Sequence, residues 1–427
     1  MDGYLVVLAF VVLFVLGFPV VLAIGIPSIV YVLIKDLPVD LVAQRTLYAL
    51  DSFPLVAVPV FLFVGSLMNS AGISRYIYRF ADTAAGRLPG GLAQVNIFGS
   101  LIFAGMSGSA LADIGGIGRI EIDAMKSKGF STPFAAAVTS SSAIVGPIFP
   151  PSIPLIIYGT VTGVSVIQLL LGGIVPGLLC VAMLMLMTGW LAARRGYPRA
   201  ERWPTPRELW RDFRPAFPAI AAPVILIAGM LLGFFTPTEI ASVTVAYAIL
   251  VSALFYRELT WRGVTDAAYE TIRASAGILL IVAVAALFGW ILSVEQVPQH
   301  LTGVMLSVSR DPWVLLLLVN VLLLVVGMFL DSTTAILVIA PIIAKPLVAA
   351  GVDPVHLGMV VVFNLMIGLL TPPMGLALYL VADIAKVTMK DVLREMAPYY
   401  VPLAVTLLLI TYFPALTTFI PRLALGN

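Results

Sequence analysis

The chain has 427 residues, of which 61% are hydrophobic and only 11% are charged, and its formal net charge is +2. A soluble globular chain has about 25% charged residues, so these charges are too few to cover the surface of a water-soluble fold. The mean hydropathy of +1.08 agrees, and the composition predicts a multi-pass, all-α membrane protein surrounded mainly by lipid.

The N-terminal apolar stretch predicts two short membrane helices. Residues 4–34 are too many for one upright span, and Gly17 and Pro19 interrupt them, so we expect a helical hairpin. The acidic Asp2 and the lack of a small-residue cleavage site favour mature protein over a removable signal peptide. The single cysteine, Cys180, excludes a disulfide framework within the chain.

Apolar runs and their interruptions predict the next elements of the first half, since a span needs roughly 20 apolar residues. In chain order we expect a polar stretch (35–51), a span (52–70), a loop that bears Arg75, Arg79 and Arg87, an apolar stretch (92–105), a segment rich in glycine and serine (107–118), a proline-broken stretch (132–160) and a long span (166–193).

The loop predicted over residues 194–214 gives the strongest topological signal. It contains seven arginines, namely Arg194, Arg195, Arg199, Arg202, Arg207, Arg211 and Arg214. Cytoplasmic loops are enriched in Lys and Arg, so this loop is predicted to face the cytoplasm. A patch for nucleic acid or an acidic partner is the alternative, but the topological role is sufficient in a short loop, and we expect no nucleic-acid partner.

The second half of the chain repeats the first at an offset of 222 residues (327 − 105). The matching positions are Gly105-Met106 with Gly327-Met328, Gly129 with Gly351, Gly146 with Gly368, and Pro150-Pro151 with Pro372-Pro373. This gap-free register predicts an internal duplication. Arginines and lysines crowd the flanks of the first copy, whereas the flanks of the second hold Arg310, Lys345 and two histidines. We therefore expect inverted repeats, as in many secondary transporters.

Two aspartates, Asp113 and Asp331, lie between apolar stretches. A charge at the bilayer centre costs about 2.5–3.5 kcal/mol, so such a residue usually faces a cavity or a partner. Asp331 is the repeat equivalent of Ser109 (331 − 109 = 222). Either aspartate could instead cap the helix that follows a hairpin tip. For Asp331, which precedes a run of three hydroxyl residues, we favour a functional role.

The two proline pairs predict helices that open within the membrane. Adjacent prolines remove two backbone donors and clash with the preceding turn. Open backbone is tolerated at membrane depth only where protein buries it or where it lines a cavity. The freed carbonyls near 146–151 and 368–373, together with serine and threonine hydroxyls, suit a hard cation such as sodium, and half-helix N-termini suit an anionic group. A kink that only shapes packing is the alternative, which the recurrence of the motif disfavours.

We therefore predict inverted repeats with two re-entrant helical hairpins and two broken helices, which form a transport unit whose movement against a scaffold gives alternating access. The expected divisions are scaffold helices (1–70), a first transport unit (71–165, hairpin 90–127, broken helix 132–160), a connecting span with the arginine loop and further scaffold helices (166–293), a second transport unit (294–385, hairpin 312–350, broken helix 355–385) and a C-terminal span (386–427).

The chain resembles the large membrane subunit of the tripartite ATP-independent periplasmic (TRAP) transporters, over essentially its whole length. The most specific matches are the segments 107–113 (SGSALAD), 146–152 (GPIFPPS) and 370–375 (LTPPMG). The resemblance implies sodium-driven elevator transport of a carboxylate-bearing anion across the bacterial inner membrane. It also implies two partners: a small four-helix membrane subunit, expected as a separate polypeptide, and a periplasmic substrate-binding protein.

The resemblance also implies the ligands of two sodium sites. The first would use Ser107, Ser109, Gly146, Phe149 and Pro151, and the second Asp331, Gly368, Thr371 and Pro373. Phe329 stands where Ser107 stands in the first repeat, so the ligand set of the second site is less defined. The residues expected to face the substrate cavity are Asp113, Ser142, Ser332, Thr333 and Asn364.

Two other classes compete with a transporter. An intramembrane aspartyl enzyme would account for Asp113 and Asp331, but neither lies in a Gly-x-Gly-Asp context and the proline pairs would have no role. A passive channel is the other alternative, and its solute flux would not depend on a sodium gradient. The sequence has no HExxH, no Cys/His cluster and no P-loop, so we expect no enzyme activity, no transition metal and no cofactor other than sodium as the coupling ion.

Overall fold

The computed structural model describes residues 3–309 and 311–426, so Asp2 and Arg310 lie outside the described residues. Within these ranges the chain is helical and contains no strand, which confirms the all-α prediction. Eight of the described helices are long and apolar enough to cross a membrane. The multi-pass prediction is therefore confirmed.

The predicted N-terminal hairpin is present, with a turn at Gly17, whose φ is +88°. The polar stretch 35–51 contains a helix, and the prediction of a loop around Arg75 and Arg79 was wrong, because that segment is helical. Arg75 and Arg79 lie on an amphipathic helix that packs Ile77 and Ala81 inward and pairs its arginines with Glu258 and Asp212. The helices are α1 (Gly3–Val15), α2 (Val20–Ile34), α3 (Asp40–Leu50), α4 (Phe53–Ser70) and α5 (Ser74–Ala85).

The next helices contain the first turn and the first break. The chain turns at Gly108, and a second interruption, over residues 144–152, separates two helices of one apolar stretch. The elements are α6 (Leu92–Ser107), α7 (Ala110–Asp113), a π-helical turn (Ile114–Gly118), α8 (Arg119–Ser127), α9 (Thr132–Ala143), α10 (Ile153–Thr162), α11 (Val166–Gly172) and α12 (Ile174–Arg195).

The arginine loop is shorter than predicted. Helix α13 (Pro206–Leu231) already begins within it, so three of the seven arginines, Arg207, Arg211 and Arg214, lie on the first turns of that helix. Thr205 caps the helix: its hydroxyl accepts from the Glu208 N–H at 3.3 Å, and Glu208 accepts from the Thr205 N–H at 2.8 Å. This capping box is a local helix start signal that the charge pattern concealed.

The second half contains α14 (Pro237–Leu250), a π-helical turn (Val251–Phe255), α15 (Trp261–Val294), α16 (Val297–Val308), α17 (Pro312–Phe329), α18 (Ser332–Ala349), α19 (Pro354–Leu369) and α20 (Leu376–Ala385). The C-terminal segment adds α21 (Met389–Met396), a 3₁₀ turn (Ala397–Tyr399), α22 (Tyr400–Tyr412) and α23 (Ala415–Leu425). A turn precedes α18 and a break precedes α20, at the positions that match those of the first half.

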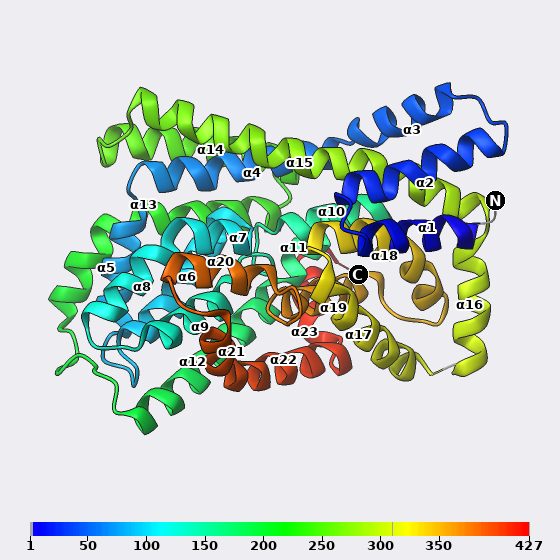
Figure 1. The fold of residues 1–427 in the computed structure, drawn as a ribbon. Coiled ribbons are helices and arrows are strands. Elements are labelled where there is room, and N and C mark those ends of the chain that lie inside the picture. Colours follow the sequence, from blue (N-terminus) through cyan, green and yellow to red (C-terminus); the bar gives the residue numbers. More distant parts are fainter. Residues whose placement is uncertain (1–2, 310, 427) are drawn as a thin grey trace.

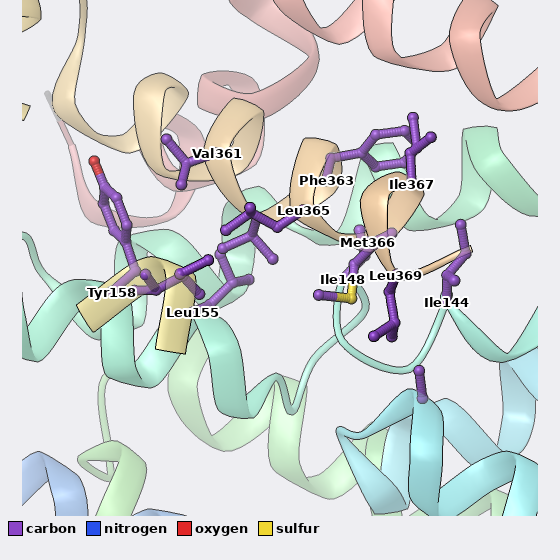
Figure 2. Packing of buried hydrophobic residues seen from close by; sticks show 14 of the residues in the cluster. Ile144, Ile148, Leu155, Tyr158, Val361, Phe363, Leu365, Met366, Ile367 and Leu369 are labelled. Carbon is purple, nitrogen blue, oxygen red and sulfur yellow. The ribbon is translucent and has the colours of Figure 1, made fainter. Parts of the chain in front are cut away.

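The helices form two layers. Helix α4 packs against α14 and α15, and α15 also packs against α2 and α3, which gives the upper layer of Figure 1. The broken helices lie below it, where α10 contacts both α18 and α19. Their buried side chains form the centre of the core, and Figure 2 shows Ile148 and Leu155 of the first broken helix beside Leu365 and Met366 of the second.

Candidate functional site

The first hairpin tip is a tight turn held by serine hydroxyls. Gly108 is left-handed, with φ +63°, and separates α6 from α7. The Ser107 hydroxyl donates to Asp113 Oδ1. Ser109 caps α7, because its hydroxyl accepts from the Ala112 N–H at 3.4 Å. The tip thus presents two hydroxyls and a carboxylate within seven residues.

The first broken helix opens where its prolines prevent the regular pattern. The backbone is not helical from Ile144 to Ser152. The Ser152 hydroxyl donates to the Pro147 carbonyl and accepts from the Leu155 N–H at 3.2 Å, so it caps α10. The Pro150–Pro151 bond is cis, as is the Pro372–Pro373 bond in the second half. Backbone carbonyls in this stretch are left without helical partners.

Tip and break meet through two glycines. A methyl group on Gly146 would lie 2.7 Å from Asp113 Oδ2 and 3.5 Å from the Ser109 nitrogen. A methyl group on Gly108 would lie 2.6 Å from the Pro151 carbonyl oxygen. The Ile153 N–H donates to the Gly108 carbonyl at 3.4 Å. A Cβ at Gly108 would collide with backbone, and a Cβ at Gly146 would displace the Asp113 carboxylate, so this close contact depends on glycine at both positions.

This contact brings together four of the five residues predicted for the first sodium site, namely Ser107, Ser109, Gly146 and Pro151. Asp113, predicted for the substrate cavity, lies in the same cluster. It is 2% exposed, and its Oδ2 has no hydrogen-bond partner among the described residues. We call Ser107, Ser109, Asp113, Gly146 and Pro151 the tip-one cluster. The side chain of the fifth predicted residue, Phe149, lies against Gly177 of α12.

The tip-one cluster has the chemistry of a hard-cation site. Its groups are hydroxyl, carboxylate and backbone carbonyl oxygens, which are the ligands that hard cations prefer. The described residues contain no group of three His, Cys, Asp or Glu side chains suited to a metal ion, so the donor set does not resemble a transition-metal site. A cation here would also compensate the buried carboxylate oxygen, which is costly to leave unpaired.

The second tip differs from the first in its acidic residue. Asp331 caps α18: its Oδ2 accepts from the Thr334 N–H at 3.1 Å and its Oδ1 from the Thr334 hydroxyl at 2.5 Å. Asp331 therefore acts as a helix cap, which was the alternative to a functional role. Its side chain remains partly exposed, so it can also contact a cation. Ser332 and Thr333 form the first turn of α18 and are also partly exposed.

The second tip contacts the second break through backbone. A methyl group on Gly368 would lie 2.5 Å from Gly327 Cα, and the Met374 N–H donates to the Met328 carbonyl at 3.2 Å. The Thr371 hydroxyl instead donates to Ile367 O at 2.7 Å. Among the described residues, no hydrogen bond joins Asp331 to Gly368, Thr371 or Pro373, so this predicted site is less assembled than the first.

Two polar networks tie the broken helices to the hairpins. The Ser142 hydroxyl donates to Asn96 Oδ1 at 2.8 Å, and Asn96 donates to Glu121 Oε2 at 2.9 Å and Thr139 Oγ1 at 2.8 Å. Ser100 completes this network by donating to the Ser142 oxygen at 3.0 Å. These side chains are all buried. Ser142, predicted for the substrate cavity, therefore lies in a packed network.

The second network is built on Asn364, a third buried member of the predicted cavity set after Asp113 and Ser142. It donates to Asn320 Oδ1 at 2.8 Å and to Asn320 O at 3.0 Å, and Asn320 donates to Thr411 Oγ1 at 2.9 Å. Sequence reasoning missed Asn96, Glu121 and Asn320. A polar residue inside an apolar helix was the available signal.

A cavity of about 260 Å³ adjoins the first tip. Its walls come from α4, from α15 and from the turn that follows the tip, and they include Ser66, Asn69, Ser107, Gly116 and Glu270. Ser66 donates to Glu270 Oε2 at 2.6 Å, and a methyl group on Gly65 of α4 would lie 3.1 Å from Ser107 Cα. The cavity thus lies at the boundary between the two layers.

Comparisons with known proteins give one consistent result. Residues 7–416 match the family model described as "Tripartite ATP-independent periplasmic transporter, DctM component". The sialic acid TRAP transporter large permease protein SiaM of Vibrio cholerae is 43% identical over 92% of this chain and 92% of its own length. The C4-dicarboxylate TRAP transporter large permease protein DctM of Rhodobacter capsulatus is 33% identical, covering 90% of this chain and 91% of that protein.

Two further matches differ in length or in sequence. The sialic acid TRAP transporter permease protein SiaT of Haemophilus influenzae is 38% identical over 90% of this chain but only 62% of its own length. Among solved structures, the Alcanivorax borkumensis YdaH transporter superposes with a TM-score of 0.59 at 16% identity, covering 88% of this chain and 87% of that one. This last likeness shows the fold alone.

Proposed function

The chain belongs to the DctM component family of the tripartite ATP-independent periplasmic transporters, and from this we propose that it is the permease subunit that couples sodium entry to the uptake of a small organic anion. It is a large permease of the TRAP type with multiple membrane helices. Sodium coupling, the elevator movement and the identity of the partners are the parts that we propose.

The tip-one cluster is the observation that carries sodium coupling. It combines a buried carboxylate whose Oδ2 lacks a partner, the Ser107 and Ser109 hydroxyls, and the backbone around Gly146 and Pro151. We propose that sodium binds there, with Asp113 as a ligand in addition to the five residues predicted from the resemblance. A second sodium would bind Asp331, Gly368, Thr371 and Pro373, where Pro373 is exposed and the break is open.

We further propose that the hairpins and broken helices move as one unit along the layer of α4, α14 and α15. The Gly327–Gly368 and Gly146–Asp113 contacts join each tip to its break, which would keep both cation sites intact during the movement. The cavity between Ser107 and Glu270 lies at the boundary that such a movement would follow. Sodium bound at both tips would provide positive charge for the anion, since the described tip residues carry none.

The substrate and partners follow from the family. Relatives are named for sialic acid and for C4-dicarboxylates, both of which carry carboxylates. We propose a carboxylate-bearing substrate, a small four-helix membrane subunit, a periplasmic substrate-binding protein and a location in the bacterial inner membrane. The arginine loop between α12 and α13 would then face the cytoplasm. The relatives are transporter permeases, and we propose no enzymatic role for Asp113 or Asp331.

The test is uptake into proteoliposomes that contain the chain with its membrane partner and binding protein. Radiolabelled succinate and N-acetylneuraminate are supplied with an inward sodium gradient, or with an equal potassium gradient. Accumulation above the external concentration only with sodium supports the proposal, whereas equal flux under both gradients indicates a channel. Asp113→Asn keeps the size of the side chain and removes its charge, and we expect it to abolish the sodium response.

A further inference from the structure

One basic side chain lies between two cavities away from the hairpin tips. Lys345 of α18 is the only lysine or arginine between residues 311 and 385. Its side chain is exposed and lines both a cavity of about 910 Å³ and a cavity of about 530 Å³. Thr162 and Ala344 also line both cavities, so the two spaces adjoin where α10 and α18 lie side by side.

The walls of the larger cavity mix apolar side chains with polar ones and include one positive charge without an ion-pair partner among the described residues. Arg422 of α23 also lines it, but its guanidinium pairs with Asp353 Oδ2 at 3.3 Å. Lys345 has no ion-pair partner among the residues that the structure describes. Ser165 and Gln168 line the same space. The Tyr158 hydroxyl is buried in its wall without a hydrogen-bond partner in the described chain.

The smaller cavity leads from Lys345 to the boundary between the layers. Its walls include Asp51 and Ser52, just before α4, Gly289 and Ser293 of α15, and Pro341 of α18. The boundary is the one along which the hairpin unit is proposed to move. A solute held by Lys345 therefore lies at the entrance to the proposed transport path.

The position along the membrane normal follows from α12. This helix runs from Ile174 to Arg195, about 33 Å at 1.5 Å per residue, and ends at the arginine loop. The arginine loop is drawn at the far left of Figure 1. Ser165 and Gln168 line the larger cavity and precede α12 in the chain, so they lie at the end of this helix that is away from the loop. In the proposed orientation this is the periplasmic side.

We propose that Lys345 is the centre of an outer binding site for the carboxylate group of the transported anion, occupied before the anion reaches the hairpin tips. A lysine ammonium is a compact charge with three donors, and the neighbouring hydroxyl and amide groups can bind the polar remainder of the solute. The inference rests on the proposed function for the identity of the anion. The two proposed anion sites differ in their need for sodium: binding at the hairpin tips requires bound sodium, whereas binding at Lys345 does not.

A cysteine reporter tests the site without transport. The single native cysteine, Cys180, is buried and is replaced by serine, and Val348→Cys places a thiol in the larger cavity. The purified full-length chain is reacted, in sodium-free choline buffer, with methanethiosulfonates that carry a sulfonate or a trimethylammonium group. We expect Lys345→Gln to lower the preference for the sulfonate reagent by about threefold or more, as loss of one nearby charge requires. Lys345→Arg should retain the preference.

The second measurement is whether a carboxylate solute protects the introduced cysteine from labelling. Succinate should slow the labelling of Val348→Cys without sodium when Lys345 is present, and should have no effect with Lys345→Gln. Lys386→Gln, at the end of α20 and outside both cavities, is the charge-matched control and should behave like the parent.

The proposal is overturned if the reagent preference is unchanged by Lys345→Gln, if succinate does not protect, or if protection requires sodium. Sodium-independent protection alongside sodium-indifferent uptake would instead reject the proposed function and retain the Lys345 site.

Discussion

Ser142 of α9 and Asn364 of α19 lie 222 positions apart (364 − 142), and each hydrogen-bonds an asparagine in the helix that leads to the neighbouring hairpin tip. Ser142 donates to Asn96 and Asn364 donates to Asn320, both at 2.8 Å. The asparagines themselves are not repeat equivalents, because 320 − 96 is 224. The two halves thus make the same connection with different residue pairs, and in each half it fastens a broken helix to its hairpin.

Replacing Asn364 by leucine should destabilise the protein. The change removes two hydrogen bonds to Asn320 and leaves that residue's buried carbonyl oxygens with fewer partners. Because interhelical hydrogen bonds in membranes average about 0.6 kcal/mol and buried unpaired groups cost about 1–3 kcal/mol, we expect a loss of about 1–2 kcal/mol. Thermal unfolding in detergent measures it. Thr406→Val is the control, since that hydroxyl bonds only within its own helix, and an equal loss there would contradict the prediction.

Gly146→Ala should weaken sodium binding. The added methyl group would lie 2.7 Å from Asp113 Oδ2, so the carboxylate must move from its place in the tip-one cluster. We expect the sodium concentration for half-maximal uptake to rise by about tenfold, equivalent to about 1.4 kcal/mol. Gly277→Ala on α15 is the matched control, because a methyl group there meets nothing within 4 Å. If both variants need the same sodium concentration for half-maximal uptake, Gly146 is not part of the sodium site.

Ser109→Ala and Asp331→Ala should each abolish sodium-driven uptake while the protein still inserts in the membrane. Each change removes an oxygen ligand from one proposed sodium site, and Asp331→Ala also removes the cap of α18. Asp331→Asn separates the two effects, since asparagine caps helices as well as aspartate but has no charge. Retained stability with lost uptake supports the ligand role. Normal transport by both alanine variants would show that the sodium sites are assigned wrongly.

The contribution of Glu295 to the stability of the protein should decrease at acid pH. It accepts from the Tyr31 hydroxyl at 2.5 Å and pairs with Lys35 at 3.2 Å, and these contacts lower the pKa of the carboxyl from its ordinary value. A depressed pKa in the folded state stabilises the protein above the unfolded-state pKa, and this contribution is lost as pH falls through the folded-state pKa. We expect the stability difference between parent and Glu295→Gln to shrink as the pH falls below the ordinary pKa of a glutamate carboxyl. A difference that is constant with pH would refute the pairing.

Much of the fold was predictable because membrane helices must satisfy their own backbone and stay apolar. The proline pairs marked both breaks correctly, Gly108 marked the first turn, and Asp331 marked the second. The arginine-bearing segments 75–87 and 194–214 contain more helix than the sequence predicts, because a high density of charge does not distinguish a loop from a helix at the membrane surface. Their helices are stabilised by the Arg79–Asp212 pair and by the Thr205 cap, which are a tertiary and a local contact respectively.

The sequence alone determined that the chain is helical and crosses the membrane several times, because composition and the length of apolar runs express constraints on single segments. The internal duplication, read from the recurrence of glycines and prolines, stays a prediction. Tertiary structure decided which oxygens meet. Asp113 joins Ser107 and Gly146 because Gly108 reverses the chain and the opened helix then fits against the tip, whereas Asp331 is bonded to its own helix. Spacing along the chain does not specify such contacts, since they depend on how two interrupted helices pack.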